Sequence, residues 1–187
     1  MKTINKSINS LDKDTFERLC KEVCNTYQAG GKIIATGLGK NAPICEKFEG
    51  TLLSFGLPAR FLHTNTAIHG DLGVVSKGDL VLILSKSGET PESIYLLKEL
   101  KKRQVAIWIL TFNPESTLAK SAENSLIIKM DNEGDAWNIV PNNSTTVYLI
   151  VLQAIAILTA EKLGITLDDF RKNHPGGGIG VRLNETK

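Results

Sequence analysis

The sequence predicts an α/β fold in which helices cover both faces of a parallel β-sheet. Short apolar segments rich in β-branched residues alternate along the chain with segments of helical periodicity. Two of the apolar segments, 79–85 (DLVLILS) and 105–112 (VAIWILTF), are apolar on both faces. This is typical of parallel strands buried between two layers of helices. We therefore expect a three-layer α-β-α sandwich.

Each predicted element has its own local signal. A long amphipathic helix is expected over about 3–29, where apolar residues recur at helical spacing until two glycines end it. The strands are expected at 32–37, 59–63, 79–85, 105–112 and 125–130. The later helices are expected at 42–56, 91–103 (with proline in its first turn), 114–122, 144–163 and 167–173, before a glycine-rich tail.

Composition indicates one globular domain. The chain has 187 residues, of which 42% are hydrophobic, and a net charge of +2, so its charge does not indicate binding to nucleic acid or a membrane surface. The most apolar run, 147–158, is shorter than the ~20 residues of a membrane span. It contains Gln153, so we expect a helix buried in the core or a subunit interface. There is no signal-peptide pattern, and the 3 cysteines are an odd number; we expect a cytoplasmic protein with reduced thiols.

Polar segments follow four of the predicted strands. Ligands of open parallel sheets bind beyond the carboxyl ends of the strands, so these segments are expected to meet at one edge. The segments are 36–41 (TGLGKN), 63–73 (HTNTAIHGDLG), 85–90 (SKSGET) and 131–146 (DNEGDAWNIVPNNSTT).

The segment 85–90 predicts a phosphate site. Ser85, Ser87 and Thr90 offer hydroxyls, Gly88 allows a tight turn, and Pro91 begins a helix whose free N–H groups point back at that turn. The alternative is that Thr90 only caps the helix and the serines only form the turn. A cap accounts for one hydroxyl and not for three, so a phosphate site is favoured.

The segment 36–41 excludes common cofactors. Its G-x-G lacks the third glycine of a dinucleotide fingerprint, and its spacing is not that of a P-loop. NAD and ATP are therefore not expected. Lys40 is either a surface lysine or a cation that holds a sugar oxygen or a phosphate.

Two histidines and two glutamates are candidates for acid–base chemistry. His69 and His174 lie in glycine-bearing loops, Glu92 begins a helix, and Glu133 lies in a long irregular loop. Each has a structural alternative: a histidine bonded to a backbone carbonyl, or a carboxylate that only stabilises the helix dipole. The histidine spacing does not match a metal motif, so no metal is expected.

The segments TGLGKNA, AIHGDLGVV, SKSGETPES, TFNPES, VPNNSTT and NHPGGGIGVRL together resemble the sugar isomerase (SIS) domain family. HGDLG followed later by HPGG resembles, more specifically, the arabinose 5-phosphate isomerase group of that family. The resemblance implies a flavodoxin-like or Rossmann-like domain with a five-stranded parallel sheet, and a homotetramer. It also implies metal-free, cofactor-free interconversion of D-ribulose 5-phosphate and D-arabinose 5-phosphate, which supplies a precursor of 3-deoxy-D-manno-octulosonate (KDO) for lipopolysaccharide or capsule.

The resemblance also assigns residues to the reaction, which passes through an enediol or enediolate. Glu92 or Glu133 is expected to move the proton between C1 and C2. His174, reaching a neighbouring subunit's site, is expected to act at the oxygens or to open the sugar ring. Lys40 and His69 are expected to orient or neutralise oxygens. The substrate- and phosphate-binding positions expected are Gly39, Asn41, Ser85, Ser87, Gly88, Thr90, Ser144 and Thr145.

The chain departs from the family pattern in places. Asn41 replaces the usual serine, Lys86 stands where asparagine is common, and Asn142 and Asn143 replace Thr-Ser. Lys86 could strengthen phosphate binding or point into solvent. We expect one SIS domain over 1–187, with a core at about 32–164, a C-terminal HPGG segment at 165–187 and no CBS domains.

Three alternative functions remain at this stage. One is a SIS isomerase of a hexulose or heptose phosphate, and another is an amino-sugar phosphate enzyme; both would share the phosphate site but not the HGDLG and HPGG pair. The third is a non-catalytic sugar-phosphate sensor, which would have no use for Glu92, Glu133 and His174.

Overall fold

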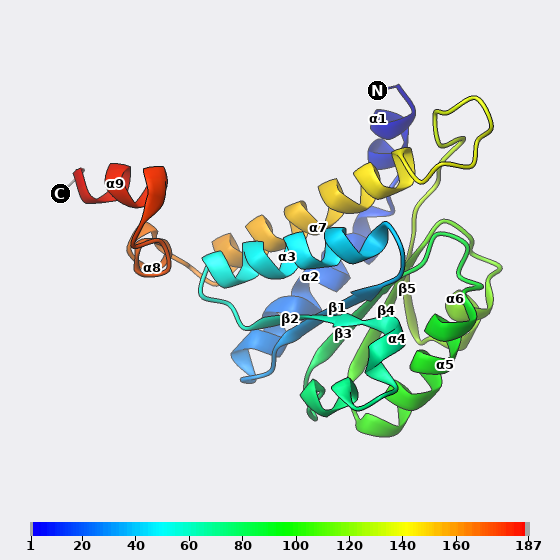
Figure 1. The fold of residues 1–187 in the computed structure, drawn as a ribbon, viewed down its shortest axis with the longest axis horizontal. Helices are drawn as coiled ribbons and strands as arrows, with labels where there is room; N and C mark the ends of the chain where they lie inside the picture. The colour runs from blue at the N-terminus through cyan, green and yellow to red at the C-terminus, as the bar shows by residue number, and fades with distance from the viewer. Residues whose placement is uncertain (1, 186–187) are drawn as a thin grey trace.

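The computed structural model describes residues 2–185 and has one parallel sheet at its centre (Figure 1). The strand order is β2-β1-β3-β4-β5, and every neighbouring pair is parallel. The α/β fold with a five-stranded parallel sheet is therefore confirmed. The strands are β1 Ile33–Gly37, β2 Ala59–His63, β3 Leu80–Leu84, β4 Ala106–Thr111 and β5 Asn124–Ile127.

Helices cover both faces of this sheet, as the two apolar segments predicted. On one face, α2, α3 and α7 pack in a core that includes Leu19, Phe48 and Leu152. On the other, α5 and α6 pack in a second core that includes Leu96 and Leu118. The helices are α1 Lys2–Asn9, α2 Lys13–Gln28, α3 Asn41–Ser54, α4 Thr64–Ala67, α5 Pro91–Leu100, α6 Thr117–Ser121, α7 Asn143–Lys162, α8 Leu167–Lys172 and α9 Gly177–Glu185, with 3-10 turns at Asp71–Val74 and Lys101–Arg103.

The pairing register brings three strand ends together. Gly37, the last residue of β1, lies opposite both His63 of β2 and Leu84 of β3. All five residues of β1 and all five of β3 are buried. The chain segments that leave these strands therefore start from adjacent points of one edge.

The most apolar helix, α7, lies against the core. Its 20 residues make it long and apolar enough to cross a membrane, and 56% of its most apolar window is buried inside the fold. Tyr148, which is fully buried, donates a hydrogen bond from its hydroxyl to the carbonyl of Leu110 at 2.8 Å. Ile150 and Ile157 on the same helix remain exposed.

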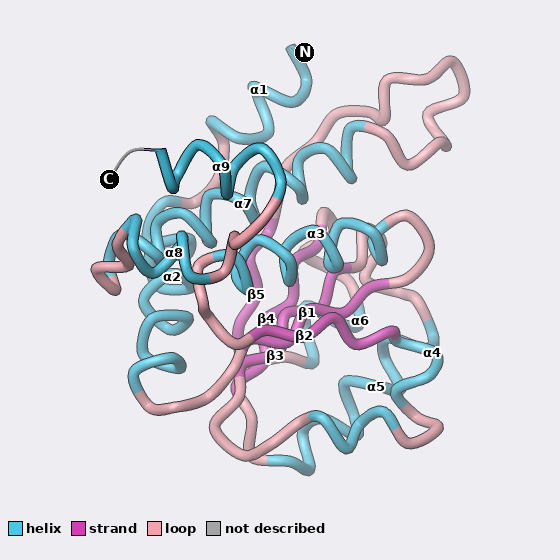
Figure 2. Tube along the Cα trace, turned by 60° about the vertical axis from the view of Figure 1, so that its left-hand side comes forward, coloured by secondary structure: helices cyan, strands magenta, loops and turns pink. Residues whose placement is uncertain are grey.

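Two terminal segments differ from the expectation. The N-terminal region forms two helices and not one, because the Asp12 side chain accepts the Thr15 N–H at 2.8 Å and starts a new helix. The glycine-rich tail is helical over α9. Figure 1 shows α8 and α9 beyond the end of α7, outside the layers that cover the sheet, and Figure 2, in which that side of the molecule is turned forward, shows them in front of these layers.

The cysteines are free thiols, as expected. Cys20, Cys24 and Cys45 are all buried and unpaired. Burial raises the pKa of the Cys20 thiol to about 11, so this thiol stays protonated and unreactive near neutral pH.

Candidate active site

The carboxyl ends of β1 and β3 enclose a polar pocket of about 250 Å³. We call this pocket the cradle. Two of the segments predicted to meet at the sheet edge, 36–41 and 85–90, form it together with the first turn of α5. The residues that line it are Leu38, Asn41, Leu84, Ser85, Lys86, Ser87, Thr90 and Ser93.

Hydroxyls and backbone N–H groups order the cradle loop. The Ser85 hydroxyl lies 3.1 Å from the Thr90 hydroxyl and accepts the Gly88 N–H at 3.1 Å. The Ser87 hydroxyl accepts the Glu89 N–H at 3.2 Å. Thr90 occupies the N-cap position of α5, but its side chain caps no helical N–H. The alternative that Thr90 only caps the helix is therefore wrong, and its hydroxyl faces Ser85 in the cradle. The serine hydroxyls do bond N–H groups of the turn, as the same alternative expected.

Ser93 is a cradle residue that sequence reasoning missed. Its side chain is 1% exposed, its hydroxyl has no hydrogen-bond partner among the described residues, and it lines the pocket. An unpartnered buried hydroxyl is costly unless a ligand or water binds it. Its spacing of i+3 from Thr90 was the available signal, because residues at that spacing share a helix face.

Gly88 lets the cradle loop pack against the next loop. Its φ is +65°, and a Cβ at this position would lie 2.1 Å from the Ser116 hydroxyl oxygen. The end of β4 supports the same loop: the Thr111 hydroxyl donates to the Lys86 carbonyl at 3.1 Å, and the Asn113 side chain donates to the Ser87 carbonyl at 3.2 Å. The loop is thus held in place by contacts within the protein.

Glu133 is completely buried, and donors surround its carboxylate. One oxygen lies 2.6 Å from Lys86 Nζ and accepts the Ser144 hydroxyl at 2.7 Å. The other accepts the N–H of Ser144 at 2.9 Å and of Asn142 at 3.0 Å. These N–H groups belong to the start of α7, where the helix dipole favours a negative charge.

The surroundings of Glu133 lower its pKa. Burial acts to raise the pKa of this carboxyl, but the hydrogen bonds from Lys86, Ser144 and Asn142 together outweigh burial and bring the pKa below its ordinary value of 4.5. Glu133 is therefore an ionised carboxylate at neutral pH.

Lys86 neither points into solvent nor simply lines the cradle. Its ammonium group pairs with Glu133, and its side chain remains 42% exposed. The residue also lines a second pocket of about 410 Å³, between the cradle loop and the loop after β5, together with Asn113, Asp131 and Asn138. The ion pair joins the cradle loop to Glu133, the candidate base.

The other predicted site residues differ in how close they lie to the cradle and to Glu133. Lys40 and Glu92 are exposed and adjoin the cradle residues Asn41 and Ser93 in the chain. Gly39 has a φ of +57° in the turn before Asn41. Thr145 bonds the Asn142 carbonyl at 2.9 Å and so stabilises the first turn of α7. His69 is exposed after α4, a helix that packs beside α5.

His174 lies far from this site in the same chain. It follows α8, and the neighbouring Asn173 bonds the Ser54 carbonyl at the end of α3 opposite to the cradle. Its ring stacks on Phe170 at 3.9 Å between centroids, and its Nδ1 lies 2.9 Å from the Phe170 carbonyl oxygen. One chain alone does not bring His174 to the cradle.

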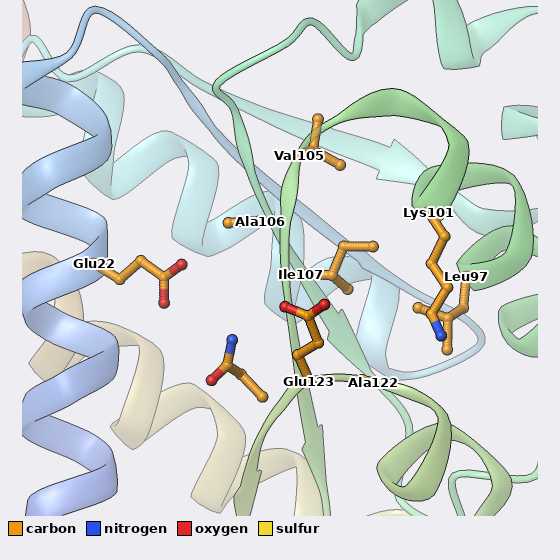
Figure 3. Close-up of a pocket in the computed structure, with 9 residues that line it drawn as sticks. Glu22, Leu97, Lys101, Val105, Ala106, Ile107, Ala122 and Glu123 are labelled. Atoms are coloured by element: carbon orange, nitrogen blue, oxygen red, sulfur yellow. The ribbon is translucent and has the colours of Figure 1, made fainter.

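A pocket at the opposite, amino-terminal edge of the sheet is a poor candidate for a site. Figure 3 shows Glu22, Lys101 and Glu123 around it. Glu22 already accepts the indole N–H of Trp108, and Lys101 donates to the Ser121 carbonyl. Within residues 2–185, no group of three His, Cys, Asp or Glu side chains could hold a metal ion.

Replacing Gly88 with alanine tests how tightly the cradle is packed. We expect Gly88→Ala to lower the free energy of unfolding by more than Gly39→Ala. Both positions have positive φ, at a strain of about 1–2 kcal/mol, but a Cβ at Gly39 would meet nothing within 4 Å. Urea denaturation of both variants measures this, and equal losses would contradict the close contact with Ser116.

The pH dependence of stability tests the state of Glu133. A carboxyl whose folded pKa is depressed stabilises the fold above its ordinary pKa of 4.5, and that stability is lost as pH falls through the folded pKa. The destabilisation of Glu133→Gln is therefore expected to be largest near neutral pH and to shrink below about pH 4. Urea denaturation over this pH series measures it, with the exposed Glu161→Gln as control. A destabilisation that stays constant with pH would mean that Glu133 is not held ionised.

The chain is similar in sequence and structure to proteins of one known family. The SIS domain family matches residues 26–158. Arabinose 5-phosphate isomerase KdsD of Pseudomonas aeruginosa is 39% identical over 92% of this chain and 56% of its own length. The KdsD of Escherichia coli K12 is 37% identical over 90% of this chain and 50% of its own. The chain thus spans about half the length of these relatives. A solved structure of an E. coli CFT073 protein, c3406 in complex with arabinose 5-phosphate, is 36% identical with a TM-score of 0.86, covering 93% of this chain and 90% of that one. On its fold, its motifs and the match over most of its length, the chain belongs to the SIS domain family.

Proposed function

We propose that this chain is an aldose–ketose isomerase that interconverts D-ribulose 5-phosphate and D-arabinose 5-phosphate. The observation that carries the proposal is an ionised, buried carboxylate beside the cradle. Glu133 forms an ion pair with Lys86, and Lys86 itself lines the cradle alongside the hydroxyl groups. A phosphate in the cradle would hold the substrate by a group remote from the reacting carbons. The KdsD relatives and the solved structure with bound arabinose 5-phosphate support the choice of sugar.

The cradle suits a phosphate monoester better than a neutral group. Hydroxyls of Ser85, Ser87 and Thr90 surround it, the unpartnered Ser93 hydroxyl lines it, and the N-terminus of α5 opens onto it. A helix N-terminus of this kind favours an anion through its free N–H groups and its dipole.

The proposed reaction moves one proton between neighbouring carbons. A carboxylate, Glu133 or the more exposed Glu92, removes the proton from C1 of the ketose or C2 of the aldose and returns it to the other carbon. A second proton moves between the oxygens on C1 and C2 during the same reaction. The enediolate therefore forms and is reprotonated without an oxidant. Lys40 and His69 would stabilise the developing negative charge on oxygen, and His174 would act at the oxygens or open the ring.

Exposed apolar residues support an oligomer. Leu167, Ile179 and Val181 are each more than half exposed on the segment that carries α8 and α9. An apolar groove beside α7, which Ile8, Leu11 and Phe16 line, adds a second surface of this kind. We propose a homotetramer in which the α8–α9 segment places His174 in a neighbouring copy's site.

The cellular role is also part of the proposal. We place the enzyme in the cytoplasm, with no cofactor, where D-arabinose 5-phosphate would serve as a precursor of KDO for lipopolysaccharide or capsule. The KdsD name of the relatives supports this role. The alternative function is a sugar-phosphate sensor of the same fold, and the donor-surrounded Glu133 favours the enzyme, since a sensor needs no buried base.

An isomerase assay tests the reaction. Purified protein is expected to convert D-ribulose 5-phosphate to D-arabinose 5-phosphate with EDTA present. Glu133→Gln is expected to lower kcat by at least about 100-fold, within the range of acid–base catalysis. Ser87→Ala is expected mainly to raise KM, because the hydroxyl binds the phosphate in ground and transition states alike. The exposed Glu161→Gln is the matched control. Saturable binding of the sugar phosphate without turnover would favour the sensor.

Mixing two inactive variants tests the shared site. In a tetramer with random subunit exchange, Glu133→Gln and His174→Ala chains are expected to recover activity at about a quarter of the sites, where the two intact residues meet across an interface. The measurement is turnover of the mixed sample against each variant alone. No recovery in a mixture shown by mass spectrometry to be exchanged would place His174 outside its neighbour's site.

A further inference from the structure

We propose that Lys86 is a positioning residue that couples phosphate binding in the cradle to the availability of Glu133 as a base. The inference rests on the proposed function and adds a mechanism for how the site is switched on. In the free protein the Lys86 ammonium group pairs with the Glu133 carboxylate. A phosphate bound in the cradle attracts this ammonium group away from the carboxylate.

The carboxylate of Glu133 has no vacant acceptor site in the free protein. A carboxylate offers about four lone-pair positions, and each Glu133 oxygen already has two donors, from Lys86, Ser144 and Asn142. The side chain is also 0% exposed. A carboxylate in this state cannot take a proton from a substrate carbon until one donor leaves.

Lys86 is the donor that can leave. The N–H donors of Ser144 and Asn142 belong to the first turn of α7 and its N-cap, which are fixed by the helix, and the Ser144 hydroxyl is buried on the same turn. The Lys86 backbone is fixed as well, since its carbonyl accepts the Phe112 N–H at 3.2 Å and the Thr111 hydroxyl at 3.1 Å. Its side chain, however, is 42% exposed and flexible.

The cradle offers Lys86 a competing partner. Lys86 lines the cradle, and its ammonium group pairs with Glu133, so the side chain lies between the carboxylate and the pocket proposed to hold the phosphate. A phosphate monoester carries about −1.5 to −2 charges near neutral pH, more than the single charge of a carboxylate. When the phosphate attracts Lys86, one lone pair of Glu133 becomes vacant. The hydrogen bond from Lys86 no longer counteracts the effect of burial, so the proton affinity of Glu133 rises.

Other charged groups near Glu133 do not supply this effect. Tyr148 of α7 has its pKa raised by burial and stays neutral. On the loop of Glu133 itself, Asp131 pairs with Lys6, and Asp135 accepts backbone N–H groups that include Trp137 at 2.9 Å. Lys86 is the one cation that neutralises Glu133 in the described part of the chain.

The experiment measures the pKa of Glu133 directly, without turnover. The full chain is labelled with carboxyl-¹³C glutamate, Glu133→Gln identifies the resonance, and inorganic sulfate is the probe because it stays a dianion in the acid range. In wild type, sulfate is expected to raise the pKa of Glu133 by about 1, a typical effect of removing an adjacent cation. Amide resonances of Ser87 and Ser93 report whether sulfate occupies the cradle.

Charge variants of Lys86 separate coupling from direct repulsion. In Lys86→Met and in Lys86→Gln, the pKa of Glu133 is expected to be raised already without sulfate and to move little when sulfate is added. Lys86→Arg, which keeps the charge, is expected to restore the sulfate response. Lys120→Met removes another exposed, paired lysine and is expected to behave as wild type.

The possible outcomes distinguish the coupling through Lys86, the anion cradle and the proposed reaction. Sulfate binding with the same pKa response in wild type and Lys86→Met would overturn the coupling and leave the cradle intact. No sulfate binding at any concentration tested would overturn the coupling and the anion cradle together. Coupling with no isomerase turnover in the separate assay would overturn the proposed reaction and retain the role of Lys86.

Discussion

The parallel register of the sheet is the constraint on which the site depends. Gly37 lies opposite both His63 and Leu84, and a Cβ on Gly37 would come within 2.8 Å of the Asn41 side chain. The first turn of α3 therefore sits directly over the end of β1, beside the loop that leaves β3. The cradle exists because backbone pairing brings these two turns into contact, and its hydroxyls then only need to face inward.

The buried carboxylate places a second requirement on the same edge. A charge with no exposure is stable only when hydrogen bonds and opposite charge compensate for lost hydration. For Glu133 the compensation comes from the start of α7 and from Lys86, which belongs to the loop after β3. Because β4 lies between β3 and β5, this ion pair crosses over the end of a strand and links two loops that the sheet itself keeps apart. The cradle loop and the carboxylate are thus linked by one ion pair.

The sequence predicted the fold well because its main signals are local. The doubly apolar strands and the proline at the start of α5 mark elements that the structure contains. The break before α2 was missed, since the capping contact of Asp12 with Thr15 competes with a helical pattern that runs across it. The helical tail was missed because the glycines at its start, Gly177 and Gly178, weaken the propensity signal.

The site was less predictable, because its chemistry depends on contacts between distant segments. Ser85, Ser87 and Thr90 could be assigned to one candidate loop because they lie within a single short segment. The pairing of Lys86 with Glu133 joins positions 47 residues apart in the chain, by 133 − 86, and no local pattern could show it. Ser93 was overlooked because its i+3 spacing from Thr90 indicates only a shared helix face, and the sequence does not show that its buried hydroxyl lacks a partner.

The position of His174 supports our proposal that the active unit is larger than one chain. The 20 residues of α7 extend about 30 Å at the rise of an α-helix, and they separate the segment that carries His174 from the end of α7 that holds Glu133. The bond between His174 Nδ1 and the Phe170 carbonyl requires the ring proton on Nδ1, so in the neutral imidazole Nε2 is the acceptor. The stacked Phe170 ring fixes the direction of that nitrogen. A histidine held in one tautomer, on a segment outside the core and far from its own chain's cradle, is suited to act on a substrate bound by another copy.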